Sequence, residues 1–412
     1  MGKSTIFGVC TPMRLLITTA HYFSDLPGGP ARIACDLAKE FASSGYEVWL
    51  IAQGTNEGDP EYQQQEGIHL LRYFIPESRG IEISRHKKHF VEVIRLLKKY
   101  LPEPPDVIHG NDYLIYFAVM EHYRGHRRSF YSIHSPMIEE LPIAWKGQGW
   151  KGYVKCLFGL PIIRRIECCI LENSTGLAAE SRFTMDLIRE NYGGEIADRI
   201  RIIPGSVDTH RFRVLEDVNK VRLAMGWPVD RPVLFVLRRL ERRMGLENLL
   251  CAVDKLHRKG LDFFLVVGGT GSLSGSLLAE RDRLGLQNCV SFIGRVPDEK
   301  LPLAYASCDA SVMPTAQLEG FGIPLLEAMA CGKPVFATPV GAIPEIVRPF
   351  EPRWIARSAD PSDVAELLGA FLTGNLPVHP PEQIREYIEA NYSAEIAHDG
   401  YSEFLRLPRL RN

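Results

Sequence analysis

The stretch LEGFGIPLLEAMACGKP, residues 318–334, decides the fold of this chain. An apolar run typical of a β-strand precedes it, and a helical pattern follows its glycines. Gly320 and Gly322 permit a close backbone approach, and Pro324 suits the first turn of a helix. Such a strand–loop–helix unit presents free N–H groups and the positive end of a helix dipole. It therefore predicts an α/β fold with a place for a diphosphate.

Two carboxylates bracket this loop, Glu319 before the turn and Glu327 within the helix. At this spacing they can reach different hydroxyl groups of one ligand, as a glutamate does when it binds paired hydroxyls of a ribose or hexose. For Glu327 a second interpretation stays open, in which the helix dipole stabilises a carboxylate of the first turn.

Outward from this stretch, short β-branched apolar runs alternate with longer helical patterns over almost the whole chain. This alternation predicts parallel sheets with helices on both faces. Strands are expected at 15–17, 48–51, 69–71, 107–109 and 130–133 and, after a polar interruption, at 233–236, 263–267, 290–293, 310–312 and 334–337. The predicted fold is α/β, with two Rossmann-like doubly wound lobes that face a central cleft.

The length of 412 residues allows two or three domains at roughly 100–200 residues each. The restart of the pattern predicts two, an N-terminal domain over 1–207 and a C-terminal domain over 208–412. The last helices, at about 381–407, are expected to return to the first domain. Ligands of open α/β sheets bind at the carboxyl ends of the strands, so motifs from both lobes should converge.

Composition narrows the class of protein. The chain has 48 Lys and Arg against 50 Asp and Glu, a net charge of -2, which argues against a nucleic-acid binder. Nine scattered cysteines without a CxxC pair indicate reduced thiols and no zinc site. The apolar run 6–10 is too short for a signal peptide, and no stretch is long enough to span a membrane. The expected location is cytoplasmic.

Glu319, Glu327 and the GFGIPLL between them, followed by EAMACGKPV and by GAIPEIV at 341–347, closely resemble the E-x7-E region of a known family. It is the family 4 retaining glycosyltransferases, also called glycosyl transferases group 1, which have the GT-B fold. DLPGG at 25–29 is similar to the family's acceptor-lobe glycine loop, and IPGSVD at 203–208 to its interlobe PNGVD.

The resemblance implies that the domain over 1–207 binds the acceptor and that the domain over 208–412 binds the nucleotide sugar. It also implies roles for individual residues. Glu319 would contact sugar hydroxyls and Glu327 the ribose, while His134, at the end of a strand, would assist at the reacting centre. The donor would also touch Gly28, Gly29, Gly269, Gly271, Gly320, Phe321 and Gly322. His109 is a weaker acceptor-side candidate. For both histidines a purely structural role stays open.

A basic run, RRLERRMG at 238–245, stands where the family has a glycine-arginine-leucine and then a lysine-glycine. Alignment on Leu240 makes Arg239 the family arginine and leaves Met244 in the lysine's place, so Arg243 is the candidate for the second cation. Two cations are useful because the leaving diphosphate gains negative charge as the glycosidic bond breaks. A solvated charge run is the alternative.

The motif GGTG at 268–271 follows a strand, but Ser274 stands where a dinucleotide fingerprint needs its third glycine. A dehydrogenase is therefore not favoured. No D-x-D occurs, so neither a metal nor another cofactor is implied.

The stretch WKGQGWKGYVK at 145–155, followed by Arg164 and Arg165, mixes aromatic and basic residues. Two interpretations remain open, a peripheral contact with the inner face of a membrane near a glycolipid acceptor, and an exposed face of the acceptor lobe.

The predicted function is transfer of a sugar from a nucleoside-diphosphate donor to a hydroxyl acceptor (a sugar, glycolipid or small molecule), in the synthesis of a glycan, polysaccharide or glycolipid. The alternatives are a sugar epimerase or phosphorylase of the same fold and a non-catalytic sugar-nucleotide-binding subunit. Donor binding without turnover would favour the last.

Overall fold

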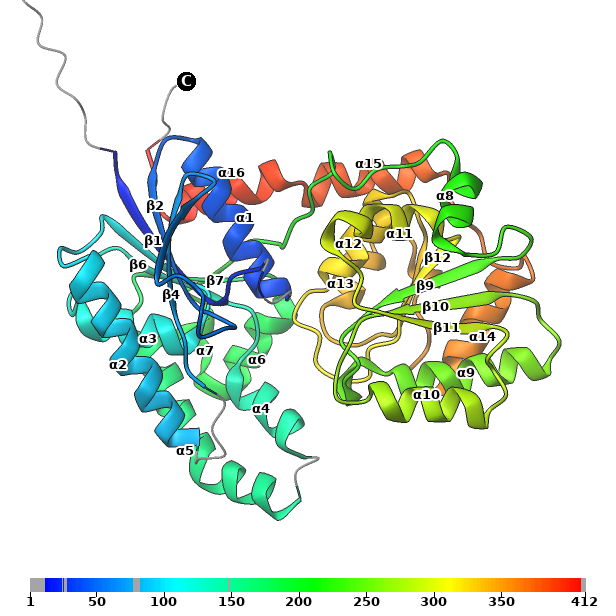
Figure 1. Cartoon of the computed structure of the whole chain (residues 1–412), viewed down its shortest axis with the longest axis horizontal. Helices are drawn as coiled ribbons and strands as arrows, with labels where there is room; N and C mark the ends of the chain where they lie inside the picture. The colour runs from blue at the N-terminus through cyan, green and yellow to red at the C-terminus, as the bar shows by residue number, and fades with distance from the viewer. Residues whose placement is uncertain (1–11, 24, 26–27, 77–81, 147–148, 409–412) are drawn as a thin grey trace, which may run out of the picture. The chain divides into compact units, whose positions relative to one another are not determined.

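The computed structural model describes residues 12–23, 25, 28–76, 82–146 and 149–408 (Figure 1). The chain divides into two compact units. The first contains residues up to Ala179, then Ile188–Arg201 and the segment from Gly400 onward; the second contains Glu180–Leu187 and Ile202–Asp399.

The first unit is built on an eight-stranded sheet of order β3-β4-β2-β1-β5-β6-β7-β8. The strands from β4 to β7 in this order pair in parallel, whereas β3 pairs antiparallel with β4, and β1 lies between β2 and β5. Its strands are β1 (Arg14–His21), β2 (Glu47–Gln53), β3 (Tyr62–Gln65), β4 (Ile68–Tyr73), β5 (Val107–Gly110), β6 (Ser129–Ile133), β7 (Gly176–Ala179) and β8 (Ile200–Ile202). The central strands are buried on both faces, as the continuous apolar runs predicted.

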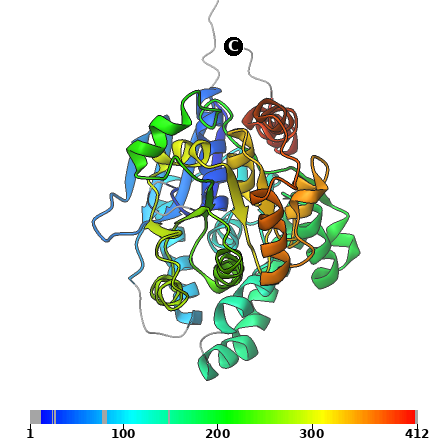
Figure 2. The same cartoon turned by 90° about the vertical axis from the view of Figure 1, so that its right-hand side faces the viewer.

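The second unit has a five-stranded parallel sheet of order β11-β10-β9-β12-β13. Its strands are β9 (Val233–Leu237), β10 (Phe264–Gly268), β11 (Val290–Gly294), β12 (Ala310–Met313) and β13 (Val335–Ala337). Helices cover both faces of this sheet (Figures 1 and 2). Two α/β units of this kind confirm the predicted fold class.

The helices alternate with the strands. Those of the first unit are α1 (Gly29–Ser43), α2 (Glu82–Tyr100), α3 (Tyr113–His122), α4 (Met137–Trp145), α5 (Trp150–Asn173) and α7 (Gly194–Ala197). Those of the second are α8 (Val218–Met225), η2 (Arg242–Met244), α9 (Leu246–Arg258), α10 (Ser274–Arg283), η3 (Asp298–Lys300), α11 (Leu301–Ser307), α12 (Ile323–Ala330), α13 (Ile343–Val347), η4 (Pro352–Trp354), α14 (Pro361–Leu372) and α15 (Pro381–Tyr392). Two helices are shared between the units, α6 (Arg182–Tyr192) and α16 (Ala394–Phe404).

The boundary between the two units lies before the predicted position at 207/208. The chain enters the second unit at Ile202, because the following turn is held there. The N–H of Val207 donates to the carbonyl of Tyr392 at 3.0 Å, and Phe321 packs directly over Gly205. The PGSVD turn therefore belongs to the second unit.

A second correction concerns the last helices. Only residues from Gly400 onward belong to the first unit, where Arg128 Nη2 donates to the carbonyls of Leu405 and Arg406. Helix α15 belongs to the second unit instead. Its Arg385 donates to the carbonyls of Thr209, Phe212 and Ala330, and these bonds tie the helix to that unit.

Candidate functional site

Two loops of the second unit start at the carboxyl ends of neighbouring strands, where the sheet order reverses between β9 and β12. This is the position at which open α/β sheets bind ligands. The loop after β9 and the loop after β12 are joined by their backbones, because Ala316 N and Gln317 N both donate to the carbonyl of Arg243, at 2.9 and 3.1 Å. A side chain on either loop is thus held relative to the other.

Glu319 lies on the loop after β12 with its side chain 12% exposed. Its Oε2 accepts a hydrogen bond from Thr315 Oγ1 at 3.1 Å and forms a short ion pair with Nη2 of Arg238. None of the described hydrogen bonds reaches Oε1. The carboxylate is therefore fixed by one oxygen, while the other has no such partner in the described part of the chain.

Arg238, the partner of Glu319, was not among the residues predicted from the sequence. It follows β9 directly, and its side chain is only 7% exposed. Its Nη2 lies 3.1 Å from Thr315 Oγ1 and 2.8 Å from the sulfur of Met244. Its Nη1 meets only the sulfur of Met313, at 3.9 Å, and Nε is buried without a partner among the described residues. Arg238 is thus paired through Nη2 with the carboxylate of Glu319, whereas Nε has no acceptor among the described residues.

The structure also shows where the candidate cations of the basic run lie. Arg243 donates from Nη1 to the carbonyl of Leu318 at 2.7 Å and so supports the loop. Arg238 is the residue whose charge lies against Met244, the position that the family resemblance gives to a lysine. In the sequence, the only feature that pointed to Arg238 was Met244, which stands where the family has a lysine. The sequence does not show which side chain reaches the space next to that methionine. Arg239 is exposed beside them.

The glycines at the end of β10 serve close backbone packing. A Cβ on Gly269, which has a φ of +122°, would lie 1.9 Å from the carbonyl oxygen of Arg238. A Cβ on Gly271 would lie 2.5 Å from the carbonyl oxygen of Leu240. Leu240 N also donates to the carbonyl of Thr270 at 2.9 Å. These glycines let the loop after β10 press against the loop that carries Arg238 and Arg239.

The loop after β12 leads into α12. Gly322 is the N-cap of this helix with a φ of +110°, and no side chain forms a cap hydrogen bond there. Gly320 offers its carbonyl to Ser181 Oγ at 2.7 Å. Phe321 is buried and packs on Tyr392, with a ring-centroid separation of 6.1 Å. Glu327 is buried within α12. All the predicted donor residues of the second unit therefore lie on this edge of one sheet or on α12.

In the first unit, His134 follows β6 and is half-buried. Its Nε2 lies 3.3 Å from Oδ1 of Asn111, which follows the neighbouring strand β5. Asp112, next in the chain, caps α3, and burial raises the pKa of its carboxyl although two backbone N–H groups oppose the shift. The side chain of His134 is thus positioned at the carboxyl edge of the first sheet.

His109 lies within β5 and is fully buried. Its Nε2 is 2.8 Å from Ser132 Oγ, and its ring lies 5.3 Å from that of Tyr401. Burial lowers the pKa of His109 from 6.5 to about 3, and the nearby His134 adds to the shift. A neutral, fully buried ring favours the structural role for His109 over an acceptor contact.

This burial predicts a pH dependence of stability. Between about pH 6.5 and pH 3 the unfolded chain takes up a proton that folded His109 cannot bind, so the free energy of unfolding should fall as the pH falls through this range. The free energy of unfolding, measured with urea at several pH values, should depend less steeply on pH in His109→Gln than in the wild type. The exposed His257→Gln variant should keep the wild-type slope; identical slopes for all three proteins would contradict the assignment.

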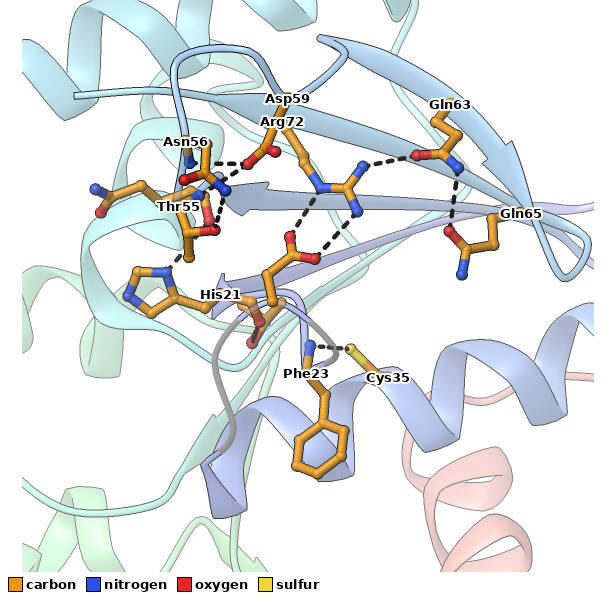
Figure 3. Close-up of polar contacts among 12 residues, drawn as sticks. His21, Phe23, Cys35, Thr55, Asn56, Asp59, Gln63, Gln65 and Arg72 are labelled. Carbon is orange, nitrogen blue, oxygen red and sulfur yellow. Dashed lines mark hydrogen bonds and ion pairs between the residues drawn. The ribbon is translucent and has the colours of Figure 1, made fainter. Parts of the chain in front are cut away.

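The predicted glycine loop of the first unit joins β1 to α1. Gly28 is the N-cap of α1, with extended backbone and no side-chain cap hydrogen bond, and Gly29 is the first residue of the helix. Asp25 forms an ion pair with Arg72 of β4 at 2.9 Å. Figure 3 shows Arg72, which also donates to Gln63. This pair anchors the start of the loop to the sheet, whereas Leu26 and Pro27 lie outside the described residues.

Two absences hold for the described part of the chain. No group of three or more His, Cys, Asp or Glu residues gathers there in a way that could hold a metal ion. Within the same residues, no helix is both long and apolar enough to cross a bilayer.

Two α/β units with loop sites at the carboxyl edges of their sheets define a GT-B type protein. Family models described as "Glycosyltransferase Family 4" and "Glycosyl transferases group 1" match residues 27–211 and 217–391 respectively. The chain therefore belongs to the family 4 glycosyltransferases, which confirms the resemblance found in the sequence.

Curated relatives agree with this assignment. A D-inositol 3-phosphate glycosyltransferase of Corynebacterium jeikeium is 33% identical over 224 residues, covering 52% of each chain. A GDP-mannose-dependent alpha-(1-6)-phosphatidylinositol monomannoside mannosyltransferase of Mycolicibacterium smegmatis is 31% identical over 222 residues, 52% of this chain and 57% of that protein. The chain thus spans about half the length of these relatives.

Solved structures agree in fold. A sucrose-phosphate synthase of Thermosynechococcus elongatus aligns with a TM-score of 0.81 at 20% identity, over 96% of this chain and 98% of that one. Anabaena Alr3699/HepE in complex with UDP-glucose aligns with a TM-score of 0.73 at 17% identity, over 96% and 99%.

Proposed function

We propose that the chain is a retaining glycosyltransferase that moves a sugar from a nucleoside diphosphate to a hydroxyl group of an acceptor. The observation that carries this proposal is the buried Arg238–Glu319 pair at the reversal point of the second sheet, in a chain of this family. The name of the Mycolicibacterium relative, which is GDP-mannose-dependent, supports a nucleoside-diphosphate donor.

In the proposed reaction, the bond from the anomeric carbon to the diphosphate oxygen breaks, and the acceptor oxygen bonds to the same face of that carbon. The acceptor proton passes to the departing phosphate oxygen. Arg238 and Arg239 stabilise the charge that develops on the diphosphate. Because Glu319 is engaged by Arg238 and Thr315, it is better suited to orient sugar hydroxyls through Oε1 than to act as a nucleophile.

The other residues keep the roles predicted from the sequence. Glu327 would bind the ribose, and Gly320, Phe321 and Gly322 at the start of α12 would contact the donor. For His134 we keep the predicted role at the reacting centre, and for Gly28 and Gly29 the predicted contact with the donor. We assign the acceptor to the first unit. The positive charge at the diphosphate comes from arginine side chains, so we propose that turnover needs no metal and persists in a chelator.

The first test is a thermal-shift screen of nucleoside diphosphates with the full chain. A ligand at about 100 times its dissociation constant should add about 2.7 kcal/mol to the free energy of unfolding, seen as a rise in Tm of the second unit. The shift should be lost in Arg238→Gln, which keeps a hydrogen-bond donor for Glu319, and kept in the exposed Arg258→Gln. No shift with any nucleoside diphosphate would contradict the donor assignment.

The second test follows release of the nucleoside diphosphate with a panel of hydroxyl acceptors, with the anomeric configuration of the product read by NMR. Acceptor-dependent release with retained configuration is expected. A requirement for inorganic phosphate would indicate a phosphorylase, free epimerised sugar an epimerase, and binding without turnover a non-catalytic subunit.

A further inference from the structure

Helix α5 presents a row of large apolar side chains to solvent. The residues of this row, the α5 face, are Trp150, Tyr153, Val154, Leu157, Phe158 and Ile162, with exposed fractions of 73, 72, 40, 54, 63 and 39%. Isolated exposed apolar residues are ordinary, but a contiguous row on one element marks a binding surface.

The row follows the period of the helix. Its members from Trp150 to Phe158 fall at i, i+3, i+4, i+7 and i+8, which places them on one side of α5. The opposite side packs into the first unit through Gly152, Ile163, Glu167, Ile170 and Leu171. The helix thus already has its packing partner, and the α5 face is a second apolar surface that the described structure leaves in solvent.

The charged residues in the segment that carries the row are all basic. No Asp or Glu occurs between Glu140 and Glu167. Lys146, Lys151, Arg164 and Arg165 are exposed. Lys155 lies over the ring of Trp145 at 5.7 Å, a partly buried cation with an apolar stem. This surface is therefore complementary to an anionic partner and would repel a second copy of itself.

We propose that the α5 face lies in the interface of a bilayer that contains anionic lipid. Tryptophan and tyrosine suit the headgroup level, while leucine and phenylalanine enter the acyl boundary and the cations neutralise lipid phosphates. In Figures 1 and 2, α4 and the start of α5 project from the lower end of the first unit. The helix lies on the membrane and does not span it. This proposal is independent of the proposed reaction.

The test is co-sedimentation of the full chain with phosphatidylcholine vesicles, with and without about one third phosphatidylglycerol. The wild type should bind the anionic vesicles. Trp150→Ser/Leu157→Ser/Phe158→Ser and Lys151→Glu/Arg164→Glu/Arg165→Glu should each weaken binding at least about tenfold. Circular dichroism and the Tm of each variant establish that it is folded.

Matched controls lie in the second unit. Leu223→Ser/Val378→Ser changes other exposed apolar residues, and Lys220→Glu/Lys259→Glu/Lys300→Glu changes an equal number of exposed cations. Both should bind as the wild type does. Insertion is measured separately from tryptophan fluorescence. Addition of anionic vesicles should shift the emission of Trp150 to the blue, and this shift should be missing in Trp150→Phe.

Three results would overturn the proposal. These are no binding of the wild type to anionic vesicles, equal binding by the apolar triple variant, and binding to polyglutamate in place of vesicles, which would identify an acidic protein as the partner. Because donor binding and turnover are measured without lipid, failure here leaves the proposed reaction intact.

Discussion

Glu319→Gln should lower kcat by about two to three orders of magnitude, as the loss of one well-placed polar group at a developing charge does in other active sites. Glutamine keeps an oxygen for Arg238 and a similar volume but removes the negative charge proposed to orient the sugar. Donor binding, measured by the thermal shift, should change much less than kcat. The measurement is acceptor-dependent release of the nucleoside diphosphate by the purified variant.

The choice of glutamine matters because Glu319→Ala would leave Arg238 buried without its ion-pair partner. Breaking a buried pair from one side costs about 3–5 kcal/mol, so alanine would mix a loss of stability with a loss of rate. Glu299→Gln, an exposed carboxylate on η3, is the matched control and should keep wild-type activity. Near-normal turnover by both single variants, Glu319→Gln and Arg239→Ala, when both are folded, would refute the roles assigned to Glu319 and Arg239.

Arg238→Gly should lower kcat/KM by about two to three orders of magnitude, because it removes a cation proposed to stabilise the leaving diphosphate. Adding Met244→Lys to this variant should restore a large part of the loss, since Arg238 Nη2 lies 2.8 Å from the Met244 sulfur and a lysine there can reach Glu319. In the wild-type background, Met244→Lys places a second buried cation beside Arg238 and should destabilise the fold.

The wild type, Arg238→Gly, Met244→Lys and the double variant form a double-mutant cycle. We expect a strong coupling between positions 238 and 244, because each substitution is harmful alone and the second offsets the first. Arg243→Gln is the comparison for the neighbouring arginine, which contacts the carbonyl of Leu318. A double variant no more active than Arg238→Gly, although folded, would show that Arg238 does not act as the second cation.

Much of the fold could be predicted because each element of a doubly wound sheet carries a local pattern. The runs 15–17 and 48–51 lie inside β1 and β2, and 233–236 lies inside β9. Strand β3 (Tyr62–Gln65) was not predicted, because YQQQ has no apolar alternation and its pairing with β4 is made by the backbone. The sequence also did not predict that Glu180–Leu187 belongs to the second unit. The hydroxyl groups of Ser181 and Thr184 donate there to the carbonyl of Gly320, which is distant in the sequence.

The sequence by itself determined the strand–loop–helix unit around Glu319 and Glu327, the two series of strands and the family, because these depend on the order and spacing of neighbouring residues. The tertiary structure alone decided that Arg238 pairs with Glu319 across 81 positions and that His109 is buried against Ser132 and Tyr401. It also decided which side of α5 is left in solvent. Burial and pairing depend on which loops the sheet order brings together, and no local spacing contains that information.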